Sequence, residues 1–202
     1  MILRLFRKAQ DGMAAVEFAL LLPVMITLFF GTVEISMALL CRADVSIMVS
    51  TASDLVAQES TVQTSDISNV YAAATTILYP YYNPSSSACS QTPAPPQCTP
   101  PTIRITSINY NSATGSTTSG KVAWTCTQAG SGTLTPATRS PADIVTLPQA
   151  IMPANGSVIM AEVAYKYSSP TMQMITGPLN MTNVWYTKPR RVMQISGPSA
   201  CP

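Results

Sequence analysis

The chain offers few residues that could carry out chemistry. Its 202 residues include no histidine, which excludes Ser-His-Asp catalysis, Cys-His catalysis and metal sites with an imidazole ligand. The sequence has no G-x-S-x-G, no Walker loop and no H-E-x-x-H, and the few carboxylates beyond residue 42 are scattered. We therefore expect no enzymatic activity, no catalytic residue, no cofactor, no metal ion and no small-molecule substrate.

The five cysteines indicate the cellular compartment of the protein rather than a chemical reaction that it carries out. No C-x-x-C is present, which argues against a redox motif or a zinc knuckle. Cys41 stands apart from Cys89, Cys98, Cys126 and Cys201, four cysteines that allow three pairings. We favour Cys89–Cys98, because closing such a short loop costs little entropy, and this leaves Cys126–Cys201. Disulfides fit an oxidising periplasm, and five unlinked thiols are the alternative.

Composition and charge narrow the class of protein. Charged residues make up only 10% of the chain, far below the ~25% of a typical soluble domain. Hydrophobic residues make up 47%, which argues against a disordered chain. The formal net charge of +2 is too small for a protein that must neutralise many phosphates, so we expect no nucleic-acid partner.

The N-terminal region carries the apolar excess. Residues 1–12 are a basic leader, and residues 18–33 hold no charge. Glu17 and Glu34 bracket that run, and the apolar character continues to Cys41. A basic segment before a first spanning helix stays cytoplasmic, so the portion after Cys41 should lie across the membrane. A signal peptide is the competing interpretation, but the apolar region is too long and no clear cleavage site follows it.

The two flanking glutamates are candidates for a function. A bilayer core needs ~20 apolar residues, whereas the uncharged run has 16, so Glu17 or Glu34 must lie close to the hydrocarbon. A charge at the centre of a spanning helix costs roughly 2.5–3.5 kcal/mol, and less near an end. The plainer alternative is a glutamate that only reaches the interface.

The start of the apolar helix resembles a processing site. Gly12 and Met13, followed by Glu17 and Phe18, resemble the G-x-x-x-x-E-[FY] pattern of type IVb prepilins. The resemblance implies cleavage between Gly12 and Met13 by a membrane prepilin peptidase. It also implies that Glu17 pairs with the new amine of Met13 on a neighbouring subunit, since a paired buried charge costs less than an isolated one. Alternatively, Glu17 only complements the helix macrodipole.

A longer stretch resembles the TadE-like family, minor pilin-like proteins that assemble the pilus of the tight-adherence secretion system. The matching residues are Gly12, Ala15, Val16, Glu17, Phe18, Ala19, Pro23, Gly31 and Glu34. ASDLVAQ (52–58) and YTKPRR (186–191) are also similar to such proteins. The resemblance implies an assembly role for Glu17, Pro23, Gly31 and Glu34.

The same resemblance implies a function, partners and a location. We expect a structural pseudopilin that is anchored in bacterial inner-membrane lipid and acts in pilus assembly. Its partners would be other pilin-like subunits, pilus-assembly proteins and a prepilin peptidase. It would cross the membrane once, with the N-terminus cytoplasmic and the C-terminal domain periplasmic, or extracellular within a pilus. The alternative is a single-pass envelope protein whose periplasmic domain binds another protein and never enters a filament.

The remaining patterns predict an α+β fold with four regions. These are a leader (1–12), a transmembrane helix (13–41), a helical stem with a second helix (42–80), and a Pro/Ser-rich loop with an antiparallel β domain (81–202). The first helix should run from about Met13 to about Ala57, either continuous or kinked, with a bend expected near Pro23 because proline lacks an N–H. The second covers 65–79, with Ser65 or Asp66 as its cap.

Strands are expected in the last half of the chain. β-branched and aromatic residues predict strands at 103–110, 121–127, 157–167 and 183–187, and a short helix is an option around 142–151. In 157–167 the apolar residues alternate with Glu162 and Lys166, which predicts a half-buried antiparallel strand. Lys188, Arg190 and Arg191 form a basic patch that is either a solvated strand end or a contact for an acidic partner or for phosphate headgroups.

Overall fold

A computed structural model of the chain describes residues 11–92, 96–113, 115–148, 150–169 and 178–202. Its helices are α2 (Asp11–Ala57) and α3 (Thr64–Ile77), with short 3-10 turns η1 (Ser87–Ser90) and η2 (Pro96–Cys98). Its strands are β1 (Thr102–Tyr110), β2 (Ser119–Gln128), β3 (Ile144–Thr146), β4 (Ser157–Tyr167) and β5 (Leu179–Thr187). The α+β class predicted from the sequence is confirmed.

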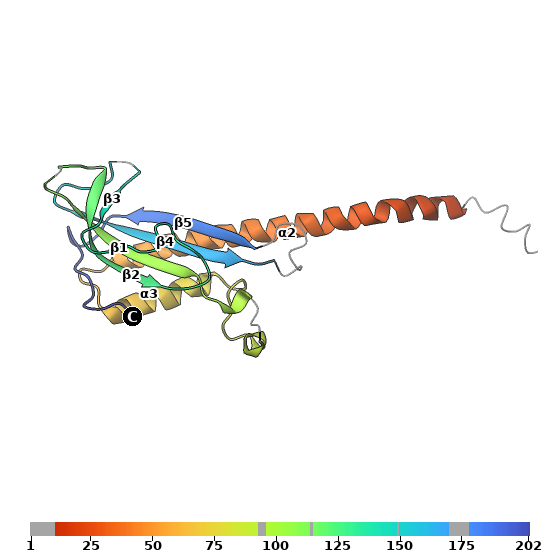
Figure 1. Ribbon diagram of the computed structural model, residues 1–202, viewed down its shortest axis with the longest axis horizontal. Coiled ribbons are helices and arrows are strands. Elements are labelled where there is room, and N and C mark those ends of the chain that lie inside the picture. Colours follow the sequence, from red (N-terminus) through yellow and green to blue (C-terminus); the bar gives the residue numbers. More distant parts are fainter. Residues whose placement is uncertain (1–10, 93–95, 114, 149, 170–177) are drawn as a thin grey trace, which may run out of the picture.

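Helix α2 is the longest element and continues without a break through Pro23. The hydroxyl of Thr27 donates a hydrogen bond of 2.8 Å to the carbonyl oxygen of Pro23, one turn earlier. Figure 1 shows that only the C-terminal half of α2 packs on the rest of the fold, while the N-terminal half projects alone. The same helix therefore meets two different surroundings along its length.

Helix α3 begins slightly before the predicted position. Gln63 is its N-cap, and the backbone N–H of Gln63 donates to the Asp66 carboxylate at 2.8 Å. Neither Ser65 nor Asp66 is the cap; Asp66 instead occupies the third helical position, where an acid can bond back to the cap residue. One apolar face of α3 is buried, at Ile67, Val70, Tyr71 and Ala74. It packs into the core that α2 shares with the sheet.

The strands form one antiparallel sheet in the order β3-β2-β1-β4-β5. Four of the strands lie where β-branched and aromatic residues predicted them. The fifth, β3, replaces the helix that was considered around 142–151: Ile144–Thr146 pairs with Ser119–Lys121. Val145 is buried while Ile144 and Thr146 are exposed, and such alternation suits a strand edge rather than a helix.

A β-bulge gives β2 side chains on both faces of the sheet. The register shifts between Ser107 and Ile108, so that they pair with Trp124 and Val122 and leave Ala123 without a direct partner. As a result Trp124 joins the core under the helices, whereas Val122 joins a second cluster on the opposite face. In an unbroken strand, residues two apart would share a face.

Both faces of the sheet are covered. The helix side is closed by α2, through a stripe at helical spacing: Cys41, Val45, Met48, Val49, Ala52 and Val56. The other side carries a smaller apolar cluster: Ile108, Val122, Val145, Leu147, Met152, Val158 and Met160. The segment between β2 and β4 supplies part of that cluster. This long loop therefore packs against the sheet and covers its second face.

Glu162 of β4 is buried beneath this loop, which corrects the prediction that it is solvated. The alternation in β4 suggested a solvated Glu162, but its exposed fraction is only 3%. Its carboxylate accepts hydrogen bonds from Arg104 at 2.7 Å and from Arg139 at 3.1 Å. Arg104 also donates to the carbonyl oxygens of Pro136 and Ala137. Strand β1, strand β4 and the loop are thus joined at one buried acid.

The buried cluster sets the ionisation of Glu162. Burial alone would raise the pKa of this carboxyl, because a low-dielectric site disfavours the charged form. The hydrogen bonds and positive charges of Arg104 and Arg139 outweigh burial and hold the pKa of Glu162 below its ordinary value. A depressed carboxyl pKa stabilises the fold above the unfolded-state pKa of roughly 4.3, and that contribution is lost as pH falls through the folded-state pKa.

Two disulfides fasten the remaining segments. Cys89 pairs with Cys98 inside the Pro/Ser-rich loop, and Cys126 of β2 pairs with Cys201 near the C-terminus. This is the pairing favoured by the sequence. Cys41 is a buried free thiol.

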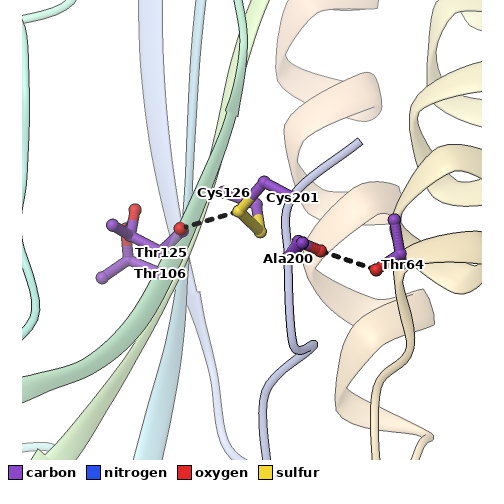
Figure 2. Close-up of a disulfide and its surroundings, with 6 residues drawn as sticks. All are labelled: Thr64, Thr106, Thr125, Cys126, Ala200 and Cys201. Carbon is purple, nitrogen blue, oxygen red and sulfur yellow. Dashed lines mark hydrogen bonds between the residues drawn. A yellow bond between two sulfur atoms is a disulfide. The ribbon is translucent and has the colours of Figure 1, made fainter.

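The C-terminal segment runs as a strap from Arg190 to Cys201, between the sheet and the start of α3. Figure 2 shows Cys201 bonded to Cys126, with the sulfur of Cys201 lying 3.2 Å from the carbonyl oxygen of Thr125. Beside it, the Thr64 hydroxyl donates to the carbonyl oxygen of Ala200 at 2.6 Å. The strap therefore ties the sheet to α3 at several points, one of them covalent.

The first prediction concerns the buried acid. Glu162→Gln should lower the free energy of unfolding at pH 7 by about 3–5 kcal/mol, because two guanidinium groups lose their counter-ion in a dry site. The difference should shrink below about pH 4, where the wild-type carboxyl also takes up a proton. Denaturant unfolding of the full chain in detergent micelles across pH measures both effects.

The matched control breaks an exposed ion pair. Asp54→Asn removes the partner of Arg190, an ion pair in which both side chains are exposed, and should cost less than about 1 kcal/mol. Equal losses for the two variants would contradict the role given to Glu162.

Candidate assembly site: the projecting helix

The projecting half of α2 is apolar on all sides. Every residue from 12 to 30 is exposed, including large side chains on each face of the helix. A helix that is hydrophobic all round is buried in a core or in a membrane, and no core surrounds this one. In the part of the chain that the structure describes, Gly12–Ala57 is the one helix long and apolar enough to cross a membrane.

The folded domain sets where the projection ends. Gly31 is buried, and Glu34, one turn further on, has an exposed fraction of only 1%. Residues 12–30 span about 28 Å at roughly 1.5 Å per residue, which closely matches a hydrocarbon core of roughly 30 Å. The free length of α2 therefore suits one crossing, with the domain abutting the far interface.

Glu17 is the one charged residue between residues 12 and 33. It is exposed, and it makes no hydrogen bond or ion pair with the described residues. About 21 Å of helix separates it from Gly31, so a crossing that ends at Gly31 leaves Glu17 inside the hydrocarbon, roughly 9 Å from the nearer edge. Sliding the helix to bring Glu17 into water would draw the folded domain into lipid.

The predicted processing residues lie together at the start of this projection. Met13 has an exposed fraction of 80%, and Phe18 is exposed beside Glu17. A Cβ atom placed on Gly12 would meet no heavy atom of the described residues within 4 Å. A side chain at residue 12 is therefore tolerated by the fold, and any effect of substituting Gly12 arises elsewhere.

The predicted assembly residues are spread along the helix rather than gathered in one place. Pro23 lies in the middle of the exposed stretch, whereas Gly31 and Glu34 lie against the domain. Glu34 is close enough to Tyr167 of β4 that, after the larger effect of burial, its charge also raises the pKa of the Tyr167 hydroxyl. Glu34 is therefore surrounded by protein and shielded from water.

The structure adds an apolar stripe that the sequence analysis missed. Beyond Gly31, large apolar side chains stay exposed on the side of α2 that faces away from the sheet: Ile35, Leu39, Leu40 and Ile47. The spacing of four between Ile35 and Leu39, continued by Ala43 and Ile47, was visible in the sequence. It was hidden because the buried stripe of the same helix carries the same kind of residue.

A long apolar helix that projects from an α+β domain defines a candidate single-pass membrane protein. A protein-family comparison then gives a more specific result: the family described as TadE-like protein matches residues 12–54. The match confirms the predicted resemblance over about a fifth of the chain, covering the projecting helix and most of its docked half but none of the sheet. No curated protein and no solved structure matches the chain.

The second prediction tests the membrane register. In protein reconstituted into lipid vesicles, Met25→Cys should resist a membrane-impermeant maleimide and react after detergent is added, because residue 25 lies in the middle of the expected crossing. Ile47→Cys should react without detergent, since residue 47 is exposed and lies beyond the domain contact. The native Cys41 thiol is buried and gives a low background. Protection of Ile47→Cys by lipid would contradict the register.

Proposed function

We propose that the chain is a structural, non-enzymatic pilin-like subunit that acts in assembly of a tight-adherence pilus. It is anchored in the bacterial inner membrane by α2, with the N-terminus cytoplasmic and the domain periplasmic. The observation that carries the proposal is a projecting helix that is apolar on all sides and carries one acid, Glu17, within the stretch that would cross a membrane. The TadE-like match over residues 12–54 supports the same assignment.

The free-energy cost of placing the Glu17 charge in lipid supports a role of this residue in assembly. An isolated charge in the hydrocarbon is unfavourable, and the docked domain prevents the helix from relieving it by sliding. A cationic partner within the membrane would offset the cost. Cleavage after Gly12 supplies such a group, because it leaves a positively charged amine on Met13. A neighbouring subunit can bring that amine to Glu17.

The exposed stripe on α2 supports the same proposal. Ile35, Leu39 and Ile47 lie beyond the expected lipid boundary, where an isolated subunit would expose them to water. Contiguous apolar surface of this kind is typical of an interaction site. Together with the lipid-facing part of α2, the stripe gives one continuous apolar surface on which other pilin-like helices can pack.

The alternative function is a single-pass envelope protein that binds another protein and never enters a filament. Two hollows beside strand β5 favour an interaction of this domain with a partner. The mature N-terminus discriminates the two functions, because only assembly through a free amine requires that the chain begin at Met13.

The third prediction concerns Glu17. Glu17→Gln should still insert into the membrane, since removing a charge lowers the cost of insertion. The association constant for pilus assembly should fall by about two to four orders of magnitude, because the partner amine stays buried without a counter-ion at a cost of roughly 3–5 kcal/mol. Surface-pilus yield, measured beside membrane abundance, tests both parts.

Glu59→Gln is the matched control, because Glu59 is an exposed acid after the end of α2. It should leave both measurements unchanged. Normal piliation by Glu17→Gln would remove the pairing proposal, and a loss of membrane abundance would indicate a folding role for Glu17 instead.

The fourth prediction concerns Gly12. Gly12→Val should leave the basic leader attached and reproduce the assembly defect, because the amine of Met13 never forms. Its folding should be unchanged, since the position is open. N-terminal sequencing of the native protein and of the variant measures cleavage directly. A native protein that still begins at Met1 would favour the envelope binding protein.

A further inference from the structure

Strand β5 forms an open edge of the sheet. The described strands end at β5 on one side and at the short β3 on the other. Exposed side chains lie along β5, and Trp185 keeps an exposed fraction of 49%. Long exposed edges are where a further strand can add by backbone hydrogen bonding, and natural proteins usually block them. Within the described residues no further strand pairs with this edge.

Two hollows flank the same edge on opposite faces. The first, of about 440 Å³, lies on the loop side and is lined by apolar groups that include Pro148, Ile151 and Val158, together with Tyr186. The second, of about 610 Å³, lies on the α2 side between Trp185 and the polar residues Ser50, Thr51 and Asp54. Residues 185–188 line both hollows. A strand lying beside β5 would direct alternate side chains to the two faces, one set into each hollow.

One backbone N–H of β5 is bonded to a side chain in place of a neighbouring strand. The N–H of Val184 donates to the side-chain oxygen of Asn183 at 2.8 Å, and the Asn183 amide is held in turn by Ser46 of α2 at 2.7 Å. A side chain thus fills the place of an acceptor from a neighbouring strand. By the alternation of an antiparallel ladder, the amides of Thr182 and Tyr186 point in the same direction.

We propose that the β5 edge binds an extended segment of a different protein by strand addition. The segment has apolar side chains at alternate positions, which enter the loop-side hollow, and an acidic residue near the C-terminal end of β5. Lys188 and Arg191 are exposed there without an acidic partner among the described residues, whereas Arg190 is taken by Asp54. Backbone bonds supply affinity, and the two hollows supply specificity.

The direction of the anchor argues against a second copy as the occupant. If α2 spans the membrane as proposed above, two copies point the same way and a two-fold axis relating them follows the membrane normal. Figure 1 shows β5 running lengthwise along α2, so this axis would set two β5 strands parallel and in register. Identical edges would then place N–H groups against N–H groups, which cannot form a ladder.

The fifth prediction tests the edge with a defined probe. A peptide of about ten residues, with valine alternating with serine or threonine and one glutamate near an end, should bind the full chain in lipid nanodiscs. Binding should slow deuterium uptake across Leu179–Thr187. The same peptide with N-methylated valines cannot form the backbone bonds and should not bind. Absence of binding by the unmodified peptide, or binding without protection of β5, would overturn the proposal.

Two variants place the binding site on the edge. Val184→Pro removes the outward N–H and should weaken binding about tenfold or more, whereas Val184→Thr keeps the N–H and should change it less than about twofold. Because Val184→Pro could disturb the fold, its unfolding midpoint is measured, and Trp185→Ala provides a second test by removing a wall of the α2-side hollow.

Unchanged peptide binding by Trp185→Ala and Val184→Pro would overturn the proposal, as would a disulfide between Val184→Cys residues of two copies. Glu17→Gln should bind the peptide normally, so this outcome is independent of the assembly role.

Discussion

The fold depends on the packing of the second half of α2 against one face of the sheet. The stripe that runs from Cys41 to Val56 packs on β4, β5 and α3 and closes the core on that face, which would otherwise meet water. The same contact fixes the position of the projecting half, because α2 is a single unbroken helix. Burial of Gly31 and Glu34 then decides where the free helix begins, and so how deep Glu17 lies in a membrane. A charge far from the domain is thus positioned by apolar packing within it.

The opposite face of the sheet is stabilised by a different kind of interaction. There, the loop between β2 and β4 is held by a buried carboxylate and two guanidinium groups, Glu162 with Arg104 and Arg139. Buried ion pairs add little net stability compared with apolar groups of the same volume, but they are costly to break singly. We therefore interpret this cluster as fixing the position of the loop, while the apolar cluster beside it supplies most of the burial.

Local patterns predicted most of the elements, and long-range contacts explain the differences. The limits of α2 and of four strands follow from runs of residues that each span several turns or pleats. Ile144–Thr146 is too short to show a period, so β3 was not expected. Glu162 looked solvated because alternation reports the two faces of a strand, but not what covers each face. For the same reason the sequence identified Glu17 and the apolar run, yet it could not show that the domain encloses Glu34, which depends on what packs against α2.

The Cys126–Cys201 bond has a mechanical consequence. It joins residues 75 positions apart, and β3, β4 and β5 all lie between them. A pull between the membrane anchor and the C-terminus is therefore carried through the bond and bypasses those three strands. The segment between the two cysteines would span roughly 250 Å if fully extended, at about 3.4 Å per residue. The disulfide prevents this extension even if the sheet unfolds. Under tension the protein is limited in extension to the segments before Cys126, and Cys89–Cys98 shortens these further.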